Sequence, residues 1–231
     1  MIDFSQFEKK TKIVFKDKKL LEQAFIHRSY INENSGGKLC HNERLEFLGD
    51  AVLELIVTDY LYNKYPDRDE GELTAYRSAL VNAIIIGEIA LSLGMNDYLL
   101  LSKGEAKDIG KARSYILANT YEAYVGAVYL DQGYDIARDF IASTLFGKID
   151  DIVAQKLWRD AKSLVQEKAQ EYINVTPSYK VINEVGPDHD KHFTVGIFFG
   201  EDKIAEGKGH SKQEAEQSSA RAALEAKNWL D

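Results

Sequence analysis

From about residue 4 to residue 147, apolar residues recur with the spacing of amphipathic or buried helices. Five helices are expected, over residues 17–33, 42–65, 71–94, 110–133 and 134–149. Pro66 is expected to end the second of these helices, and Gly94 and Gly133 the third and fourth. No segment of this region alternates apolar and polar residues as a strand does. The pattern therefore predicts an all-α domain.

The pattern changes after about residue 158. A helix is expected over residues 162–173, strands within 178–187 and 192–209, and a final helix over 212–230 with Ser211 as its N-cap. Helix, three strands and helix make a compact α+β unit of roughly 70 residues, which is large enough to fold by itself. We place the first domain at residues 1–150 and the second at 158–231.

The composition of the 231-residue chain, with 45% hydrophobic residues and three prolines, is that of a globular protein. The single cysteine, Cys40, excludes an internal disulfide and a thiolate zinc site. No apolar run reaches membrane-spanning length, and the first residues lack the pattern of a signal peptide, so a cytoplasmic protein without a membrane partner is expected. A formal net charge of −8 disfavours a nucleic-acid partner unless cationic side chains gather locally.

Three carboxylates share one side of the predicted helix 42–65. At 100° per residue, Glu43, Glu46 and Asp50 fall within an arc of about 60°. Apolar residues cover most of the remaining circumference, so we do not expect these acids to form a solvated stripe. Neighbouring buried carboxylates repel one another unless a cation lies between them, and oxygen ligands without His or Cys favour Mg²⁺ or Mn²⁺.

The predicted helix 110–133 offers partners for these acids. It is apolar or small almost all round, yet it carries Asn119 and Glu122, whose burial needs a hydrogen-bond partner or a cation. If this helix packs against helix 42–65, Asn119 and Glu122 can complete an oxygen cage, and Gly49 and Gly126 would permit the close approach. Spacing alone leaves the alternative open that the acids form ordinary ion pairs with Arg and Lys side chains.

Several segments resemble the motif blocks of the ribonuclease III family. "NERLEFLGDAVL" resembles the signature of that family, "EGELTAYRSALVN" and "ILANTYEAYVGAVYLD" resemble its next two blocks in the same order, and "HRSY" fits its first block. The resemblance implies an all-α catalytic domain that forms a homodimer and cleaves double-stranded RNA with Mg²⁺, for which Mn²⁺ can substitute. It also implies 5′-phosphate and 3′-hydroxyl product ends and a role in processing ribosomal and messenger RNA precursors.

The resemblance also implies roles for individual residues. It gives metal binding to Glu46, Asp50, Asn119 and Glu122, and catalysis to Asp50, Glu122, Glu43 and Glu70. Phe47 stands where the family has an aromatic anchor of the dimer.

Asn119 departs from the family pattern, which ordinarily has Asp at this position. An amide oxygen can bind Mg²⁺, but exchanging an anionic ligand for a neutral one removes a full charge, so metal affinity and cleavage should be reduced. Two origins stay open: a variant impaired in order to trap a complex, or a natural sequence with weakened or lost cleavage. The alternative function is a catalytically inactive double-stranded RNA-binding protein of the same fold.

The C-terminal unit resembles a double-stranded RNA-binding domain. "KSLVQEKAQ", "GPDHDKHFTV" and "GKGHSKQEAEQSSARAAL" are similar to its three contact regions. By position, Gln166, Gln170 and His189 would meet minor grooves and Lys212 a phosphate. From residue 158 onward the chain has 10 Lys and Arg against 13 Asp and Glu, so we expect this binding to be weak and steeply salt-sensitive. A third reading, a hydrolase of small phosphorylated metabolites, leaves this unit without a role.

Overall fold

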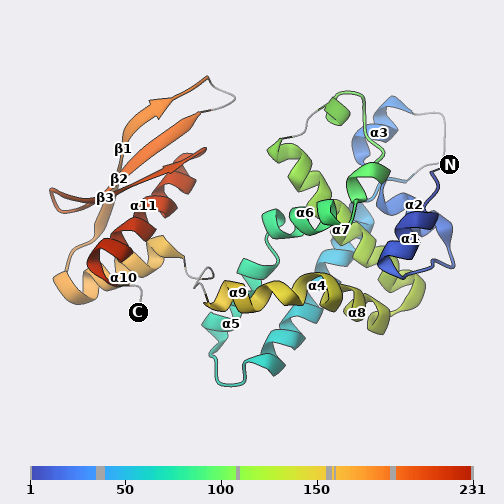
Figure 1. Cartoon of the computed structure of the whole chain (residues 1–231), viewed down its shortest axis with the longest axis horizontal. Coiled ribbons are helices and arrows are strands. Elements are labelled where there is room, and N and C mark those ends of the chain that lie inside the picture. The colour runs from blue at the N-terminus through green and yellow to red at the C-terminus, as the bar shows by residue number, and fades with distance from the viewer. Residues whose placement is uncertain are drawn as a thin grey trace. The chain divides into compact units, whose positions relative to one another are not determined.

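The structure is a computed structural model that describes residues 2–34, 40–107, 110–154, 158, 160–187 and 191–229. It divides the chain into two compact units, residues 1–158 and residues 159–231 (Figure 1). The described part of the first unit is helical apart from one isolated bridge between Ile26 and Leu100, and the second combines two helices with a three-stranded antiparallel sheet. The predicted fold class, all-α followed by α-β-β-β-α, is confirmed.

The described part of the first unit contains α1 (Ser5–Thr11), α2 (Lys18–Ala24), α3 (Arg28–Glu33), α4 (Glu43–Lys64), α5 (Glu70–Leu80), α6 (Ala83–Ser92), α7 (Lys111–Gln132), α8 (Tyr134–Leu145) and α9 (Ile149–Ala154). Three short 3-10 helices accompany them, η1 (Met95–Tyr98), η2 (Glu105–Lys107) and η3 (Phe146–Lys148). As predicted, α4 ends just before Pro66 and α7 ends at Gly133, which has a φ of +88°. Among the described residues no single helix is long and apolar enough to cross a membrane, although the bent pair α5 and α6 passes by length and composition alone.

The helix expected over residues 17–33 is interrupted, so that expectation was wrong. The chain leaves the helical conformation after α2 because Ile26 bridges to Leu100, and the amide of His27 donates to the carbonyl of Leu100 at 3.0 Å. The Nδ1 atom of His27 then caps α3, accepting a hydrogen bond of 3.3 Å from the amide of Ser29. A pairing between segments far apart in the sequence thus decides this break.

The helix expected over residues 71–94 is likewise two helices, α5 and α6, whose axes bend by 42°. The side chain of Asn82 caps α6, since its oxygen accepts hydrogen bonds of 3.0 Å from the amides of Ile84 and Ile85. The apolar pattern runs on across this point because Leu80 before the break and Ile86 after it are both buried in the same core.

Helices α4 and α7 form the most extensive helix pair of the described residues. Their backbones meet at two glycines: a Cβ atom on Gly49 would overlap the carbonyl oxygen of Glu122, and one on Gly126 would overlap the carbonyl oxygen of Leu45. Gly126 and its neighbours on α7 are fully buried, as is Leu53 on α4. The close approach predicted from Gly49 and Gly126 is therefore confirmed.

The second unit consists of α10 (Ala161–Ile173), β1 (Pro177–Val185), β2 (His192–Phe199), β3 (Asp202–Gly209) and α11 (Lys212–Lys227), with strand order β1-β2-β3. Both helices contribute to one small core against the sheet, in which Val165, Ile197 and Leu224 are buried. β3 lies directly on α11, because a Cβ atom on Gly207 would overlap the amide of Ser219.

We expect Gly49→Ala to destabilise the helical unit severely. The added methyl group would overlap the carbonyl oxygen of Glu122 and force α4 and α7 apart, at a cost of about 3 kcal/mol or more. The free energy of unfolding, measured by denaturant titration, checks this. Gly147→Ala is the matched control, since no atom lies within 4 Å of a Cβ there. A stability of Gly49→Ala equal to that of the parent would contradict the contact.

Candidate functional site

The crossing of α4 and α7 brings acidic side chains of both helices to one place. On α4, Asp50 follows Gly49 directly and Glu46 lies one turn before Asp50. On α7, Glu122 is the residue whose carbonyl oxygen lies against Gly49. Glu46 and Glu122 are half-buried, whereas Asp50 and Glu43 are exposed. The expectation that the α4 acids are shielded therefore holds for Glu46 and is wrong for Glu43 and Asp50, whose side chains are exposed to solvent.

The carboxylates at this crossing influence one another's titration. Burial, together with the negative charges of Asp50, Glu46 and Glu54, raises the pKa of Glu122 to about 7. Burial likewise raises the pKa of Glu46, with added repulsion from Glu43 and Asp50. Since such effects fall off with distance, acids from both helices form one electrostatic group.

Glu54 belongs to this group although the sequence analysis did not single it out. It lies one turn after Asp50 on the same side of α4, and its Oε2 atom pairs with Nε of Arg77 on α5 at 2.8 Å. Its spacing of four residues from Asp50 was the available signal. The alternative in which the acids form ordinary ion pairs with Arg and Lys side chains therefore applies to Glu54.

The donor set at the crossing suits a hard divalent cation. Glu46, Asp50 and Glu122 offer carboxylate oxygens, and Asn119, half-buried one turn before Glu122, offers an amide oxygen. The side chain of Asn119 makes no hydrogen bond within the described part of the chain. No three His, Cys, Asp or Glu side chains among the described residues converge into a closed metal cage. The acidic side chains thus lie near one another without pointing to a common centre, as expected for like charges.

The two further predicted catalytic acids lie in different places. Glu43 begins α4 and is in electrostatic contact with Glu46, so the fold brings it to the acidic group. Glu70 begins α5, is exposed, and lines a groove of about 440 Å³ together with Tyr62 of α4. No described interaction joins Glu70 to the acids at the α4–α7 crossing, so a single chain does not bring it there.

Phe47 is the most exposed large hydrophobic residue of the described chain, with 81% of its surface accessible. Leu55, at 58%, and Tyr62, at 70%, lie on the same side of α4, within about 80° of Phe47 around the helix. We call these three residues the α4 apolar stripe. An isolated aromatic side chain on a surface is ordinary, but a stripe along one helix is typical of a surface that another chain covers.

In the second unit, three of the four predicted RNA-contact residues are exposed. Gln166 and Gln170 are exposed on α10, and Lys212 is exposed at the start of α11. The Oγ atom of Ser211 accepts a hydrogen bond of 3.1 Å from the amide of Glu214, which confirms the predicted N-cap of α11. The fourth predicted contact, His189, lies outside the described residues.

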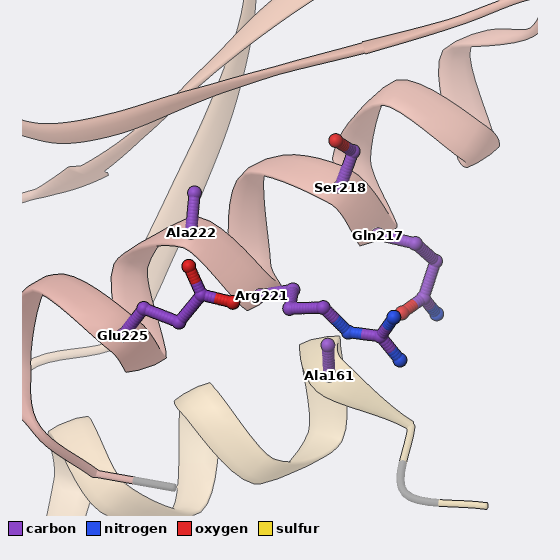
Figure 2. A pocket seen from close by; sticks show the side chains of 6 residues that line it. All are labelled: Ala161, Gln217, Ser218, Arg221, Ala222 and Glu225. Atoms are coloured by element: carbon purple, nitrogen blue, oxygen red, sulfur yellow. The ribbon is translucent and has the colours of Figure 1, made fainter. Parts of the chain in front are cut away.

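A groove of about 400 Å³ lies elsewhere in the second unit, between the start of α10 and the outer side of α11 (Figure 2). Figure 2 shows the side chain of Arg221 extending past Ala161 towards Gln217. The amide of Gln217 in turn donates a 3.1 Å hydrogen bond to the carboxylate of Asp160, which caps α10. None of the described residues predicted to contact RNA lines this groove, so it is separate from the candidate RNA-binding surface.

Comparison with known proteins assigns both units. A family model described as Ribonuclease-III-like matches residues 17–149, and one described as Double-stranded RNA binding motif matches residues 161–227. The chain belongs to the ribonuclease III family. Proteins named Ribonuclease 3 from Desulforamulus reducens and Borreliella burgdorferi are 46% and 44% identical, over 94% and 97% of this chain and 89% and 87% of their own length.

A solved structure agrees with this assignment. The nuclease domain of ribonuclease III from Campylobacter jejuni is 38% identical, covers 65% of this chain and 96% of its own, and has a TM-score of 0.56. Another structure of that domain, with a TM-score of 0.55 and 38% identity over 62% of this chain, describes flexibility in a region involved in dimer formation. Membership of the family implies a requirement for a divalent metal ion, with which the oxygen donors at the α4–α7 crossing agree.

We expect Glu122→Gln to stabilise the metal-free protein at alkaline pH. The pKa of Glu122 in the folded chain, about 7, lies above the ordinary value of 4.5, so the folded state holds this proton more tightly than the unfolded chain does. The stabilisation of the folded state by this proton is complete below about pH 4.5 and is lost as the pH rises through about 7. In EDTA, Glu122→Gln should raise the melting temperature by roughly 3 °C or more at about pH 8.5, and by less at about pH 5.

Glu88→Gln, at an exposed position of α6, is the control for this measurement. Its effect on the melting temperature should be small and should not grow with pH. If Glu122→Gln shifted the melting temperature equally at both pH values, the raised pKa of Glu122 would be wrong.

Proposed function

We propose that the crossing of α4 and α7 is the active site at which this ribonuclease III family endonuclease cleaves double-stranded RNA with Mg²⁺. The observation that carries the proposal is the meeting of Glu122 from α7 with Glu46 and Asp50 from α4 at a glycine contact. Carboxylates from two helices, one with a pKa raised to about 7, are an arrangement that a divalent cation stabilises.

Glu46, Asp50, Asn119 and Glu122 would hold the Mg²⁺ ion, since all four provide oxygen donors, and Mn²⁺ accepts the same donors. When bound, a divalent ion stabilises negative charge on the reacting phosphate and activates water, which leads to 5′-phosphate and 3′-hydroxyl ends. The glycine contact supports this role because it fixes the two helices and so limits how far the four side chains can move apart.

The other acids have different roles in this proposal. Glu43 lies at the exposed edge of the group and raises the pKa of Glu46, so it adjusts the charge of a metal ligand. Glu70 lines the same groove as Tyr62 of the α4 apolar stripe. Pairing of two chains through that stripe would therefore place Glu70 at the dimer interface, and its part in catalysis depends on the dimer.

We further propose that the chain forms a homodimer through the α4 apolar stripe. Its support is the exposure of Phe47, Leu55 and Tyr62, together with the dimer-forming region described for the C. jejuni domain. Burying an aromatic side chain that is 81% exposed provides a large share of the association free energy of such an interface.

The second unit binds the RNA duplex, by its match to the double-stranded RNA binding motif. We propose that Gln166 and Gln170 contact a minor groove and that Lys212 contacts a phosphate, with the exposure of all three as support. The substrates we propose are precursors of ribosomal and messenger RNA in the cytoplasm. The alternative is a catalytically inactive RNA-binding protein. Asn119 favours this alternative, because it removes one negative charge from the proposed metal site.

Phe47→Ala is expected to shift the chain from dimer to monomer at micromolar concentration and to lower RNA cleavage. The lost side chain is the largest exposed apolar group on the α4 apolar stripe. Sedimentation equilibrium checks the mass. Leu130→Ala, at a 53% exposed position near the end of α7 and off the stripe, should leave the dimer intact. A dimer of unchanged affinity in Phe47→Ala would rule out this interface.

Asn119→Asp is expected to raise Mg²⁺-dependent cleavage of a long RNA duplex by roughly 100-fold, because it restores an anionic donor to the divalent site. Rates are measured first with Mg²⁺ and then with Mn²⁺, and the product ends are mapped on a defined duplex. Asn96→Asp, an exposed position in η1, is the charge-matched control and should leave the rate unchanged.

Equal rates for Asn119→Asp and the parent would remove position 119 from the metal site. If neither protein cleaved duplex RNA while both bound it, the alternative of an inactive RNA-binding protein would hold. Cleavage of single-stranded RNA or duplex DNA at the same rate would contradict the proposed substrate class.

A further inference from the structure

Two side chains, Arg28 and His41, form a group beside the N-terminus of α4. Arg28, the first residue of α3, has its Nη1 atom 3.5 Å from Oε1 of Glu43. His41, two residues before Glu43, has its Nδ1 atom 3.7 Å from the other carboxylate oxygen. Arg28 and His41 are not among the site residues expected from the sequence, and the proposed metal site does not use them.

The backbone holds this group in place. Asn42 is buried, with 2% of its surface accessible, and its amide donates to the carbonyl of Ile26 at 2.9 Å. Its side-chain amide donates to the carbonyl of Ala24 at 3.1 Å, and the carbonyl of His41 accepts from Gln23 at 3.1 Å. Residues 41–43 are thus fixed to the turn from which Arg28 projects. The position of Arg28 beside Glu43 does not depend on the ion pair itself.

Arg28 makes only a weak interaction with Glu43. Its side chain is 66% exposed, and 3.5 Å is long for a charge-assisted hydrogen bond, which is ordinarily about 2.7–2.9 Å. Within the described part of the chain Glu43 is its one ion-pair partner, so most of its five N–H donors face solvent. Arg77 differs, since it pairs with Glu54 at 2.8 Å and donates to Thr58 at 3.0 Å.

His41 also has unused hydrogen-bonding capacity. Its Nδ1 atom is buried, yet no hydrogen-bond partner for it occurs among the described residues. The imidazole lies against the same carboxylate as Arg28. Glu43 therefore lies within 4 Å of both side chains, and the exposed Arg28 is the one that can turn to a second anion.

An RNA strand that approaches the α4–α7 crossing meets strong repulsion. Glu43, Glu46, Asp50 and Glu122 are all acidic, and the chain carries a formal charge of −8. A divalent ion neutralises part of this charge only near the reacting phosphate. Neighbouring phosphates need cations at the rim of the acidic group. Glu43, and with it Arg28, lies about 10 Å along α4 from Asp50, which is a distance of a few nucleotides.

We propose that Arg28, with His41 beside it, binds a backbone phosphate of the RNA a few nucleotides from the cleaved bond. This rests on the proposed active site. The guanidinium exchanges its long contact with Glu43 for two hydrogen bonds to phosphate oxygens, a geometry that arginine provides and lysine does not. Arg28 is thus a positioning residue, because it holds the strand and does not touch the reacting atoms.

The test measures Arg28→Ala in the full chain carrying Asn119→Asp, with single-turnover cleavage of a defined RNA duplex over a range of protein concentrations. The half-saturating concentration should rise about tenfold, as for loss of a solvent-exposed, charge-assisted contact to phosphate, while the maximal rate changes less than about twofold. The slope of log affinity against log salt should fall by about 1. Arg28→Lys should recover part of the affinity.

Arg138→Ala is the matched control. Arg138 is an exposed arginine of α8 in ion pairs of 3.0 Å with Asp135 and Asp139, so its loss should change neither affinity nor salt slope. Melting temperatures confirm that the variants are folded, and Arg28→Gln serves as a second neutral variant.

A Glu43→Gln background separates phosphate binding from an indirect role through Glu43. If Arg28 acts only by orienting Glu43, Arg28→Ala lowers the maximal rate and has no further effect beside Glu43→Gln. Under the proposal, Arg28→Ala raises the half-saturating concentration in both backgrounds.

An unchanged affinity and salt slope in Arg28→Ala would overturn the phosphate site even if the parent cleaves RNA. Equilibrium binding of the same duplex to the full chain in EDTA gives the same comparison without cleavage. A parent that binds but does not cleave would count against the proposed active site, while the binding ratio still decides the role of Arg28.

Discussion

The contact between the backbones of α4 and α7 is the constraint on which the helical unit depends. With Gly49 against the carbonyl of Glu122 and Gly126 against the carbonyl of Leu45, the two helices cross so closely that neither position has room for a Cβ atom. Close packing of buried side chains along both helices holds this crossing against the mutual repulsion of the carboxylates that it brings together. Any side chain larger than hydrogen at either glycine would remove the surface on which those acids meet.

Asn119 changes the balance of charge at this crossing. A carboxylate there would add one more negative charge to a group in which Glu122 already has its pKa raised to about 7, so the amide relieves repulsion within the folded protein. The same exchange removes an anionic donor from the group that would hold a divalent ion. Stability of the metal-free chain and affinity for the metal therefore respond in opposite directions to the residue at position 119.

Recognition of RNA by an acidic protein rests on where its cationic side chains lie. The acidic group at the α4–α7 crossing attracts metal ions but repels phosphates, so cations must stand at its edge. Arg28 lies at this edge in the helical unit, beside Glu43. In the second unit, Lys212 is exposed at the start of α11. Net charge misleads here, because solvent and salt screen distant charges while a contact at hydrogen-bond distance keeps its strength.

The sequence by itself determined the kind and order of the elements, the bounds of α4 and α7, the Ser211 cap, and the acids at helical spacing. These follow from local rules, namely apolar periodicity, capping and the positions of Pro66 and Gly133. Tertiary structure decided the rest. The bridge of Ile26 to Leu100 broke a continuous apolar pattern into α2 and α3, and folding separated Glu70 from the other acids while it added Glu54. Periodicity reports which side of a helix is apolar, but it does not report which element lies across from that side.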